Sequence, residues 1–112
     1  MTQTEANTIN LADFRTPGAK VFTGRDKGLH VRQKSQIDEK ENKFETVYFI
    51  IPDNIYSINP SFLEELFENV VEKLGKEKFL SKFQFINQGK YNFTKSLEEA
   101  IQRLSRKKTA LD

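Results

Sequence analysis

The sequence predicts an α/β domain whose central mixed or parallel sheet is covered by helices mainly on one face. Segments of strand character alternate along the chain with segments of helical periodicity, an order that favours right-handed crossovers between parallel strands. The clearest strand contains the continuous apolar run Val47–Ile51, as a central strand covered on both faces would. The helical segments are polar on one side, which predicts helices packed on the sheet with that side in solvent.

Composition limits what this domain can do. Its 112 residues suffice for one domain with a core, and ten Phe and three Tyr predict a packed interior. Because the chain has no Cys and a single His, His30, we expect no disulfide, no metal site and no histidine-based catalysis. His30 itself fits an exposed or half-buried helix position. The net charge of +2 argues against a dedicated nucleic-acid binder.

No segment predicts membrane insertion. Residues 1–10 lack the apolar stretch of a signal peptide, and the longest apolar runs are far below the ~20 residues needed to cross a bilayer. We therefore expect a cytoplasmic protein that contacts no membrane. We divide it into an N-terminal strand or arm (residues 1–18), the main domain (residues 19–106) and a basic tail (residues 107–112).

The first half of the chain predicts three strands and a helix. Residues 7–14 alternate polar and apolar side chains, and residues 19–23 form a second short strand. A thin apolar stripe predicts a helix over residues 29–41. Residues 44–51, rich in β-branched and aromatic side chains, form the central strand.

The second half predicts helix, strand and helix. Residues 61–74 carry one apolar stripe along a helix, and Gly75 suits its C-terminal end. Residues 82–86 alternate as a strand. The sequence Ser96-Leu97-Glu98-Glu99 fits a capping box that starts a helix running to about Arg106.

One segment carries a family resemblance. The strand at residues 47–51 and the stretch Ile55–Ile58 are followed by Asn59-Pro60-Ser61-Phe62-Leu63-Glu64-Glu65-Leu66, which opens a helix. This arrangement resembles the STAS fold of bacterial anti-sigma-factor antagonists, and more closely a STAS-like group of unknown function. Gly24-Arg25…Gly28 and the run from Gly75 to Asn87 also fit that group. The resemblance covers roughly residues 20–104 and implies a STAS-like sandwich.

The resemblance also implies a site and a partner. In STAS antagonists this helix opens with Asp-Ser-Ser/Thr-Gly, and an anti-sigma kinase phosphorylates the second hydroxyl. Ser61 matches that hydroxyl, whereas Asn59, Pro60 and Phe62 replace the other three residues, and Ile51 lies where an acidic residue is common. The implied partner is a histidine-kinase-like ATPase or another signalling protein.

The residues themselves favour a helix cap over a phosphoacceptor at this position. Ser61 and Glu64 have the spacing of a capping box, and Asn59 followed by Pro60 is a competing cap. A phosphoserine here would meet the backbone N–H groups and the positive end of the helix dipole.

Two further groups are candidate binding residues. Gly24, Arg25, Lys27 and Gly28 could form an anion-binding loop, although a tight turn is favoured because the Walker spacing is absent. Glu64, Glu65, Glu68 and Glu72 fit a solvated helix face, which is favoured; Glu64, Glu65 and Glu68 lie within about one helical turn and could instead form an acidic docking surface for a basic partner.

Basic and aromatic residues interleave in three runs, as in single-strand nucleic-acid binders. The runs are Lys78-Phe79, Lys82-Phe83-Gln84-Phe85 and Lys90-Tyr91-Asn92-Phe93. Alternation on a half-buried strand gives the same pattern, and we favour core packing.

These observations predict a non-catalytic, regulatory protein-interaction module without metal or cofactor. It would bind a signalling or defence protein through the helix starting at Ser61 and the adjacent loops. One alternative is a phage or mobile-element inhibitor of a host or defence enzyme. A second is a nucleotide or nucleic-acid binder that uses the Gly24–Gly28 loop.

Overall fold

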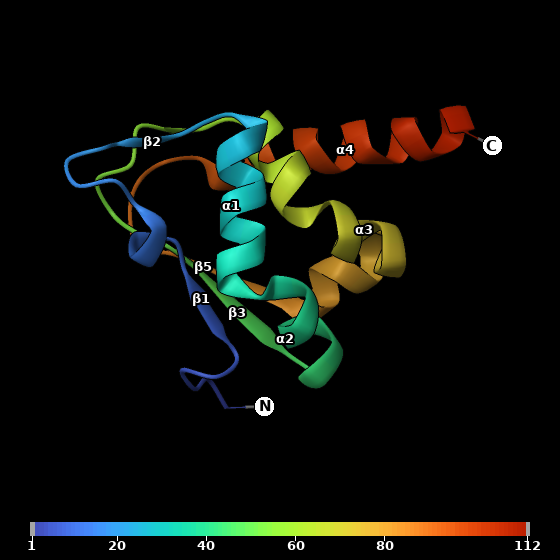
Figure 1. The fold of residues 1–112 in the computed structure, drawn as a ribbon, viewed down its shortest axis with the longest axis horizontal. Helices are drawn as coiled ribbons and strands as arrows, with labels where there is room; N and C mark the ends of the chain where they lie inside the picture. The colour runs from blue at the N-terminus through green and yellow to red at the C-terminus, as the bar shows by residue number, and fades with distance from the viewer. Residues whose placement is uncertain (1, 112) are drawn as a thin grey trace.

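The computed structural model describes residues 2–111, which form a mixture of strands and helices (Figure 1). The elements are β1 (Thr8–Asn10), a 3-10 helix η1 (Leu11–Phe14), β2 (Val21–Phe22), α1 (Arg25–Ser35), α2 (Ile37–Lys43), β3 (Val47–Ile51), β4 (Ser57–Ile58), α3 (Pro60–Lys82), β5 (Phe83–Asn87) and α4 (Phe93–Leu111).

The strands form two parallel sheets, and the predicted α/β class is confirmed. The main sheet has the order β1-β3-β5, with Ile9 opposite Phe49 and Phe49 opposite Phe85. A separate two-stranded sheet pairs β2 with β4. Both connections within the main sheet pass through helices, as parallel pairing requires.

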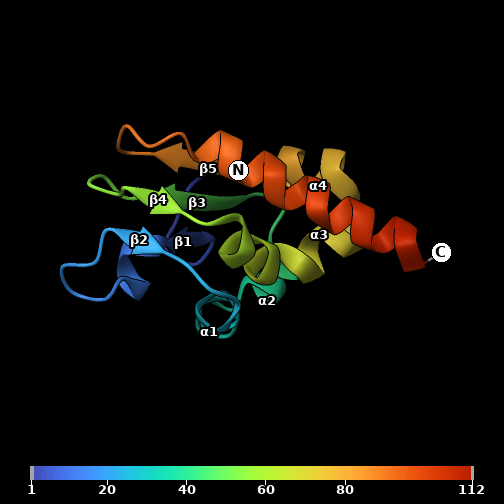
Figure 2. The ribbon, with the colours of Figure 1, turned by 90° about the horizontal axis from the view of Figure 1, so that it is seen from above.

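One face of the main sheet carries the core. Side chains alternate between the two faces of a strand, and the residues on the inner face are buried: Ile9, Val47, Phe49, Ile51 and Phe83. The opposite face is half-buried or exposed apart from Ile50, and carries Thr8, Asn10, Tyr48, Gln84 and Ile86. The helices gather on the same side of the sheet (Figures 1 and 2).

Six ring systems fill the space between the sheet and α3 and α4. Phe67 of α3 has ring centroids at 5.1–6.1 Å from Phe49, Phe79, Phe83 and Phe85. Phe93 of α4 lies 5.3 Å from Phe85. Phe62, farther along the core, packs on Phe22 at 5.3 Å. The abundance of Phe is therefore explained by packing.

Two elements of the N-terminal half differ from the sequence prediction. The strand expected over residues 7–14 ends at Asn10, because the Asn10 side chain accepts a hydrogen bond from Ala12 N at 2.9 Å and starts η1. The helix expected over residues 29–41 starts earlier, at Arg25, and is broken by Gln36, which has a left-handed backbone (φ 55°). The break directs buried Ile37 into the core.

Gly75 divides α3 into two segments. Its φ of 79° and ψ of 166° are not helical, so the first segment ends where the sequence predicts. The second segment, residues 76–82, has no counterpart in the sequence interpretation and buries Phe79.

The start of α4 also differs from expectation. The helix begins at Phe93, and Lys95 N donates to the Asn92 side chain at 3.3 Å. Ser96 is therefore inside the helix, buried, and hydrogen-bonded to the Tyr91 hydroxyl. The capping box at Ser96–Glu99 was a wrong interpretation, because Asn92 takes the capping position first.

The two terminal segments belong to regular elements. β1 lies in the main sheet, and the α4 backbone continues to Leu111, through most of the expected tail at residues 107–112; residue 112 lies outside the described residues. Within residues 2–111, no helix combines the length and apolar character required to cross a bilayer.

Candidate functional site

The start of α3 is capped by Asn59. Its side-chain oxygen accepts from Ser61 N at 2.8 Å, and its backbone carbonyl accepts from Phe62 N and Leu63 N at 3.0 and 3.3 Å. Pro60 occupies the first helical turn and has no N–H. The Glu64 side chain points to two arginines instead of back to this end, so the capping-box interpretation of Ser61 and Glu64 was wrong.

This geometry limits what Ser61 can do. Its side chain is half-buried, and each backbone N–H of residues 61–63 already has an acceptor. A phosphate on Ser61 would therefore compete with Asn59 for these donors and lack a ready-made anion site.

The expected loop at Gly24–Gly28 is the first turn of α1. Gly24 precedes the helix with φ 90°, and Gly28 N donates to Gly24 O at 3.1 Å. The segment becomes helical here because Gly28 allows α1 to approach α3. A Cβ on Gly28 would lie 2.5 Å from Phe62 O and 2.8 Å from Glu65 Cβ. The two glycines therefore have roles in the fold, and the expected loop is a helical turn; an anion site at Gly24, Arg25, Lys27 and Gly28 stays a prediction.

Replacing Gly28 by alanine should test this contact. We expect the free energy of unfolding to fall by about 1–2 kcal/mol, because the overpacked helix pair outweighs the better helix propensity of alanine. Urea unfolding followed by circular dichroism measures the loss. Gln33→Ala, on the exposed side of α1, is the matched control, and equal effects of the two changes would contradict the close approach.

The three glutamates form salt bridges within the molecule. Glu64 is 7% exposed and lies 3.6 Å from Arg25 and 3.3 Å from Arg103. Glu65 pairs with Arg32 at 2.8 Å and with Arg25 at 3.7 Å. The hydrogen bond to Glu64 raises the pKa of Arg103.

Glu68 completes this pattern, with Lys107 at 3.2 Å. Glu64, Glu65 and Glu68 are therefore ion-paired within the fold and do not form a solvated acidic face, and their part in partner docking stays a prediction. Because α1 and α4 pack on either side of α3, carboxylates beside its apolar stripe face arginines and lysines of the neighbouring helices. The sequence could not reveal which helices would flank α3.

A second surface lies where β2 and β4 lead into these helices. Tyr56 is 72% exposed and Val21 is 48% exposed, although the strands beside them are ordered by backbone hydrogen bonds. Tyr56 N donates to Lys20 O at 2.7 Å, and Asn59 N donates to Phe22 O at 2.8 Å. Lys20 Nζ lies 5.0 Å from the centre of the Tyr56 ring.

Arg15 fixes the loops beneath this surface. Its guanidinium donates to Ala19 O at 2.6 Å and to Asn54 O at 3.1 Å, joining the segments that precede β2 and β4. We call the exposed residues Val21, Arg25, Tyr56 and Asn59, together with the half-buried Lys20, the ribbon surface. The sequence interpretation missed Tyr56, whose neighbours Ile55 and Ile58 point into the core; its only signal was a large aromatic side chain among polar turn residues.

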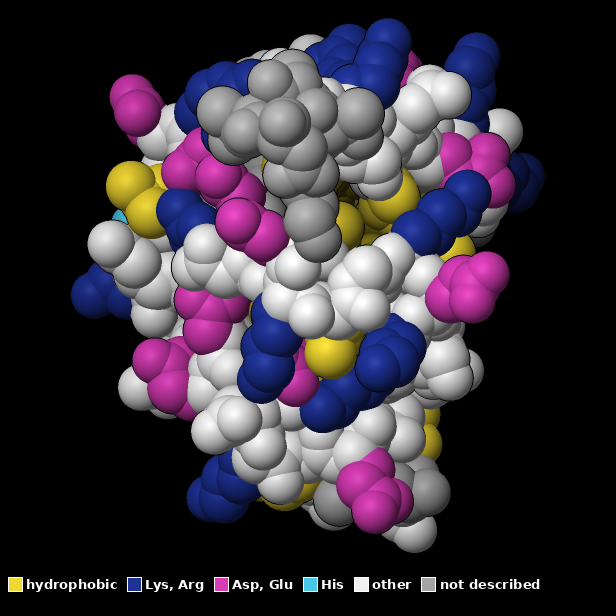
Figure 3. Space-filling view, turned by 90° about the vertical axis from the view of Figure 1, so that its right-hand side faces the viewer, with side chains coloured by type: hydrophobic (Ala, Val, Ile, Leu, Met, Phe, Trp, Pro, Cys, Tyr) yellow, Lys and Arg dark blue, Asp and Glu magenta, His cyan; other side chains and the backbone are white. Residues whose placement is uncertain are grey.

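The other candidate residues from the sequence, which are the basic and aromatic runs and His30, are either buried in the core or isolated on the surface. In the basic and aromatic runs, Phe79, Phe83 and Phe93 are buried, so their rings cannot stack on bases. His30 is exposed on α1. On the face shown in Figure 3, basic and acidic side chains are interspersed, so no large field of one sign covers it.

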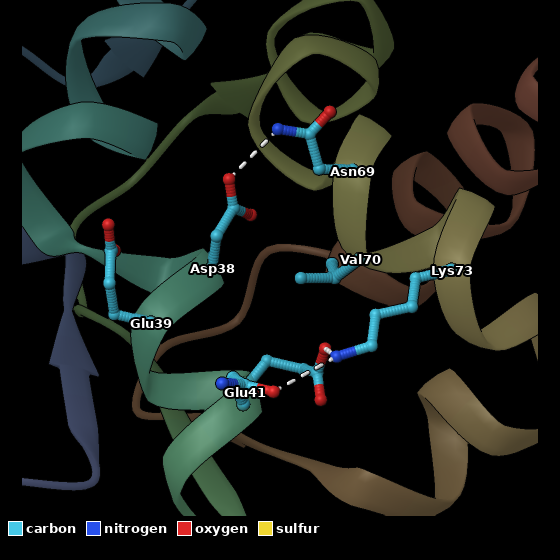
Figure 4. A pocket seen from close by; sticks show the side chains of 7 residues that line it. Asp38, Glu39, Glu41, Asn69, Val70 and Lys73 are labelled. Atoms are coloured by element: carbon cyan, nitrogen blue, oxygen red, sulfur yellow. Dashed lines mark hydrogen bonds and ion pairs between the residues drawn. The ribbon is translucent and has the colours of Figure 1, made fainter.

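A hollow of about 350 Å³ lies between α2 and α3 (Figure 4). Its wall contains the ion pair between Glu41 and Lys73, at 2.8 Å, and the hydrogen bond from Asn69 to Asp38, also at 2.8 Å. Throughout residues 2–111, no group of three or more His, Cys, Asp or Glu residues is arranged to hold a metal ion. The polar groups of the hollow are therefore mostly paired with one another, but the buried Asp38 Oδ1 has no hydrogen-bond partner.

Comparison of this chain with models of protein families, with curated proteins and with solved structures gives no match. The resemblance to STAS-like domains therefore stays a prediction from the sequence.

Proposed function

We propose that this chain is a non-catalytic, STAS-like protein-interaction module that binds its partner through the ribbon surface. The observation that carries the proposal is the exposure of Val21 on β2 and of Tyr56 just before β4, the two paired strands that precede α1 and α3. Partner binding at the start of α3 and the adjacent loops agrees with the sequence prediction, but the contact residues differ from the glutamates expected there.

Tyr56 has the properties of an interface anchor. An exposed tyrosine offers a large apolar area with few rotatable bonds, and such residues supply much of the binding energy in protein interfaces. Lys20 and the loops held by Arg15 fix its surroundings. Little conformational entropy would then be lost on binding.

The charges beside Tyr56 indicate the chemistry of the partner. Lys20 Nζ lies beside the Tyr56 ring, and Arg25 is 57% exposed although it pairs with Glu64 and Glu65 at 3.6 and 3.7 Å. We therefore propose a partner that places an apolar pocket over Tyr56 with carboxylates around it. By the resemblance, this partner is a histidine-kinase-like ATPase or another signalling protein.

Affinity purification from native cells tests the proposal. The bait is the full chain as wild type, as Tyr56→Ser and as Leu80→Ser, the last being a matched control at an exposed position on α3. We expect Tyr56→Ser to reduce recovery of the specific partner by roughly tenfold or more, the size of an anchor-residue effect, and Leu80→Ser to leave it unchanged.

The purified partner then separates direct binding from co-purification. Titration calorimetry should show the same loss of affinity for Tyr56→Ser. Equal binding by the wild type and Tyr56→Ser would remove the ribbon surface from consideration. The identity of the captured protein distinguishes a signalling ATPase from a defence enzyme, and mass spectrometry of the bait reports whether Ser61 carries a phosphate.

A further inference from the structure

β5 is an edge strand without the usual protection against pairing. It is the outer strand of the order β1-β3-β5, and its five residues pair with β3 in continuous register. Phe83–Asn87 contains no charged residue and no proline. Natural proteins commonly protect such edges with lysine, proline or a bulge, because an open edge accepts another strand.

The hydrogen-bond pattern shows which groups are available at this edge. Gln88 N donates to Ile51 O at 2.9 Å, so alternate residues back along the strand, Ile86 and Gln84, also direct their backbone groups toward β3. The N–H and C=O groups of Phe85 and Asn87 and the C=O of Phe83 therefore point away from the sheet, whereas the Phe83 N–H donates to Phe79 O at the end of α3.

β1, the strand at the opposite edge of the main sheet, is protected against pairing. β1 has only three residues and turns directly into η1. Just before it, Lys40 Nζ donates to Ala6 O at 3.0 Å and places a charged side chain across the approach to the strand. The fold thus blocks one edge of its main sheet and leaves the longer one open.

The aromatic core is incomplete at this open edge. Of the six phenylalanines that pack together between the sheet and the helices, five are buried and Phe85 is only partly buried. Phe85 lies at the middle of β5. A second aromatic ring brought to this point would complete the cover over the core.

We propose that two copies of this chain pair through β5, antiparallel about a twofold axis at Phe85, to form one six-stranded sheet. The axis places Phe85 opposite Phe85 of the second copy, and Phe83 opposite its Asn87. On the outer face, Gln84 lies opposite Ile86 of the second copy. The outward backbone groups of Phe85 and Asn87, together with the Phe83 carbonyl, supply the hydrogen bonds.

A second copy fits this edge because the strand is compatible with itself. A charged residue in a twofold strand pair brings like charges close together, and β5 has none. The nearest charge, on Lys82, is held by Glu41 at 2.8 Å and is not directed along the edge. This interface is separate from the ribbon surface, so each proposal can fail without the other.

Sedimentation equilibrium of the full chain, at concentrations up to about 1 mM, tests the proposal. We expect a reversible monomer–dimer equilibrium. The double variant Gln84→Lys, Ile86→Lys places lysines opposite each other and should dissociate the dimer. The matched variant Gln84→Glu, Ile86→Lys places Glu opposite Lys and should dimerise at least roughly tenfold more tightly than the first. Thr8→Lys, on β1, is the control and should leave the equilibrium unchanged.

Three results would overturn the proposal. The wild type could sediment as a monomer throughout, the two double variants could dimerise equally well, or Thr8→Lys could dissociate the dimer. Far-UV circular dichroism and melting temperature establish that each variant is folded.

A spin label gives the geometry independently, because the chain has no native Cys. With Gln84→Cys labelled, the twofold pairing places the two labelled Cα atoms about 8 Å apart. We expect strong dipolar broadening that disappears on dilution with unlabelled chain; a dimer without this broadening would contradict pairing through β5.

Discussion

Replacing Phe67 by alanine is expected to lower the free energy of unfolding by about 3–5 kcal/mol. The ring is 1% exposed and packs against four other phenylalanines from three different elements. Its removal leaves a cavity that rigid neighbours cannot fill. A domain of this size has a total stability of about 5–15 kcal/mol, so the variant should be close to unfolding.

Urea unfolding followed by far-UV circular dichroism measures this effect, since the chain has no Trp to serve as a fluorescent probe. Phe67→Leu keeps much of the side-chain volume and should lose less unfolding free energy than Phe67→Ala. It therefore gives a measurable loss of stability even if the alanine variant does not fold. Leu80→Ala, at an exposed position, is the control. A loss below about 1 kcal/mol for Phe67→Ala would contradict the central position of this ring.

Replacing Glu41 by glutamine should have the second-largest effect, about 3 kcal/mol at neutral pH. Glu41 is 3% exposed, and its two carboxylate oxygens contact Lys73 and Lys82, each at 2.8 Å. Lys73 precedes Gly75 and Lys82 follows it, so this one carboxylate joins α2 to both segments of α3. Glutamine cannot balance two ammonium groups. Glu39→Gln, on the exposed side of the same helix, should change stability by less than about 0.5 kcal/mol.

The effect of Glu41 should depend on pH. Burial acts to raise the pKa of the Glu41 carboxyl, but hydrogen bonds and charges from Lys73 and Lys82 outweigh burial, so the pKa lies below its ordinary value. A lowered pKa in the folded state means that this contribution to stability is present above the unfolded-state pKa and is lost as the pH falls through the folded-state pKa. The difference in unfolding free energy between wild type and Glu41→Gln should therefore shrink in acid below about pH 4.5. A difference in unfolding free energy that does not change with pH would contradict an ionised Glu41 carboxylate paired with Lys73 and Lys82.

The sequence predicted the elements whose patterns are local. The apolar run of β3 and the single apolar stripe of α3 up to Gly75 required only the periodicity of hydrophobic residues and the conformational freedom of glycine. The parallel α/β arrangement followed from the order of these elements. The place of the partner surface, at the start of α3 and its neighbouring loops, was also a prediction from the sequence, and our proposal keeps it.

What the sequence could not predict depended on contacts between distant segments. The break at Gln36 serves the burial of Ile37, and the helical turn at Gly24–Gly28 depends on the approach to Phe62. Glu64 and Glu65 had the pattern of a solvated face until α1 and α4 supplied arginines. In each case a residue's role was decided by its burial in the core or by a partner 33 to 39 positions away in the chain, which periodicity does not encode.

The all-parallel register of the main sheet has a consequence for how the chain folds. Thr8 pairs with Tyr48, and Val47 pairs with Phe83, so each strand pair closes a loop of roughly 40 residues before its first hydrogen bond forms. No pair of neighbouring strands in this sheet can start as a local hairpin. The helices, which need only near neighbours, can form first, and their collapse around the phenylalanine rings brings the three strands together. We therefore expect the sheet to assemble last, with β3, which pairs with both neighbouring strands, as the strand on which its assembly depends.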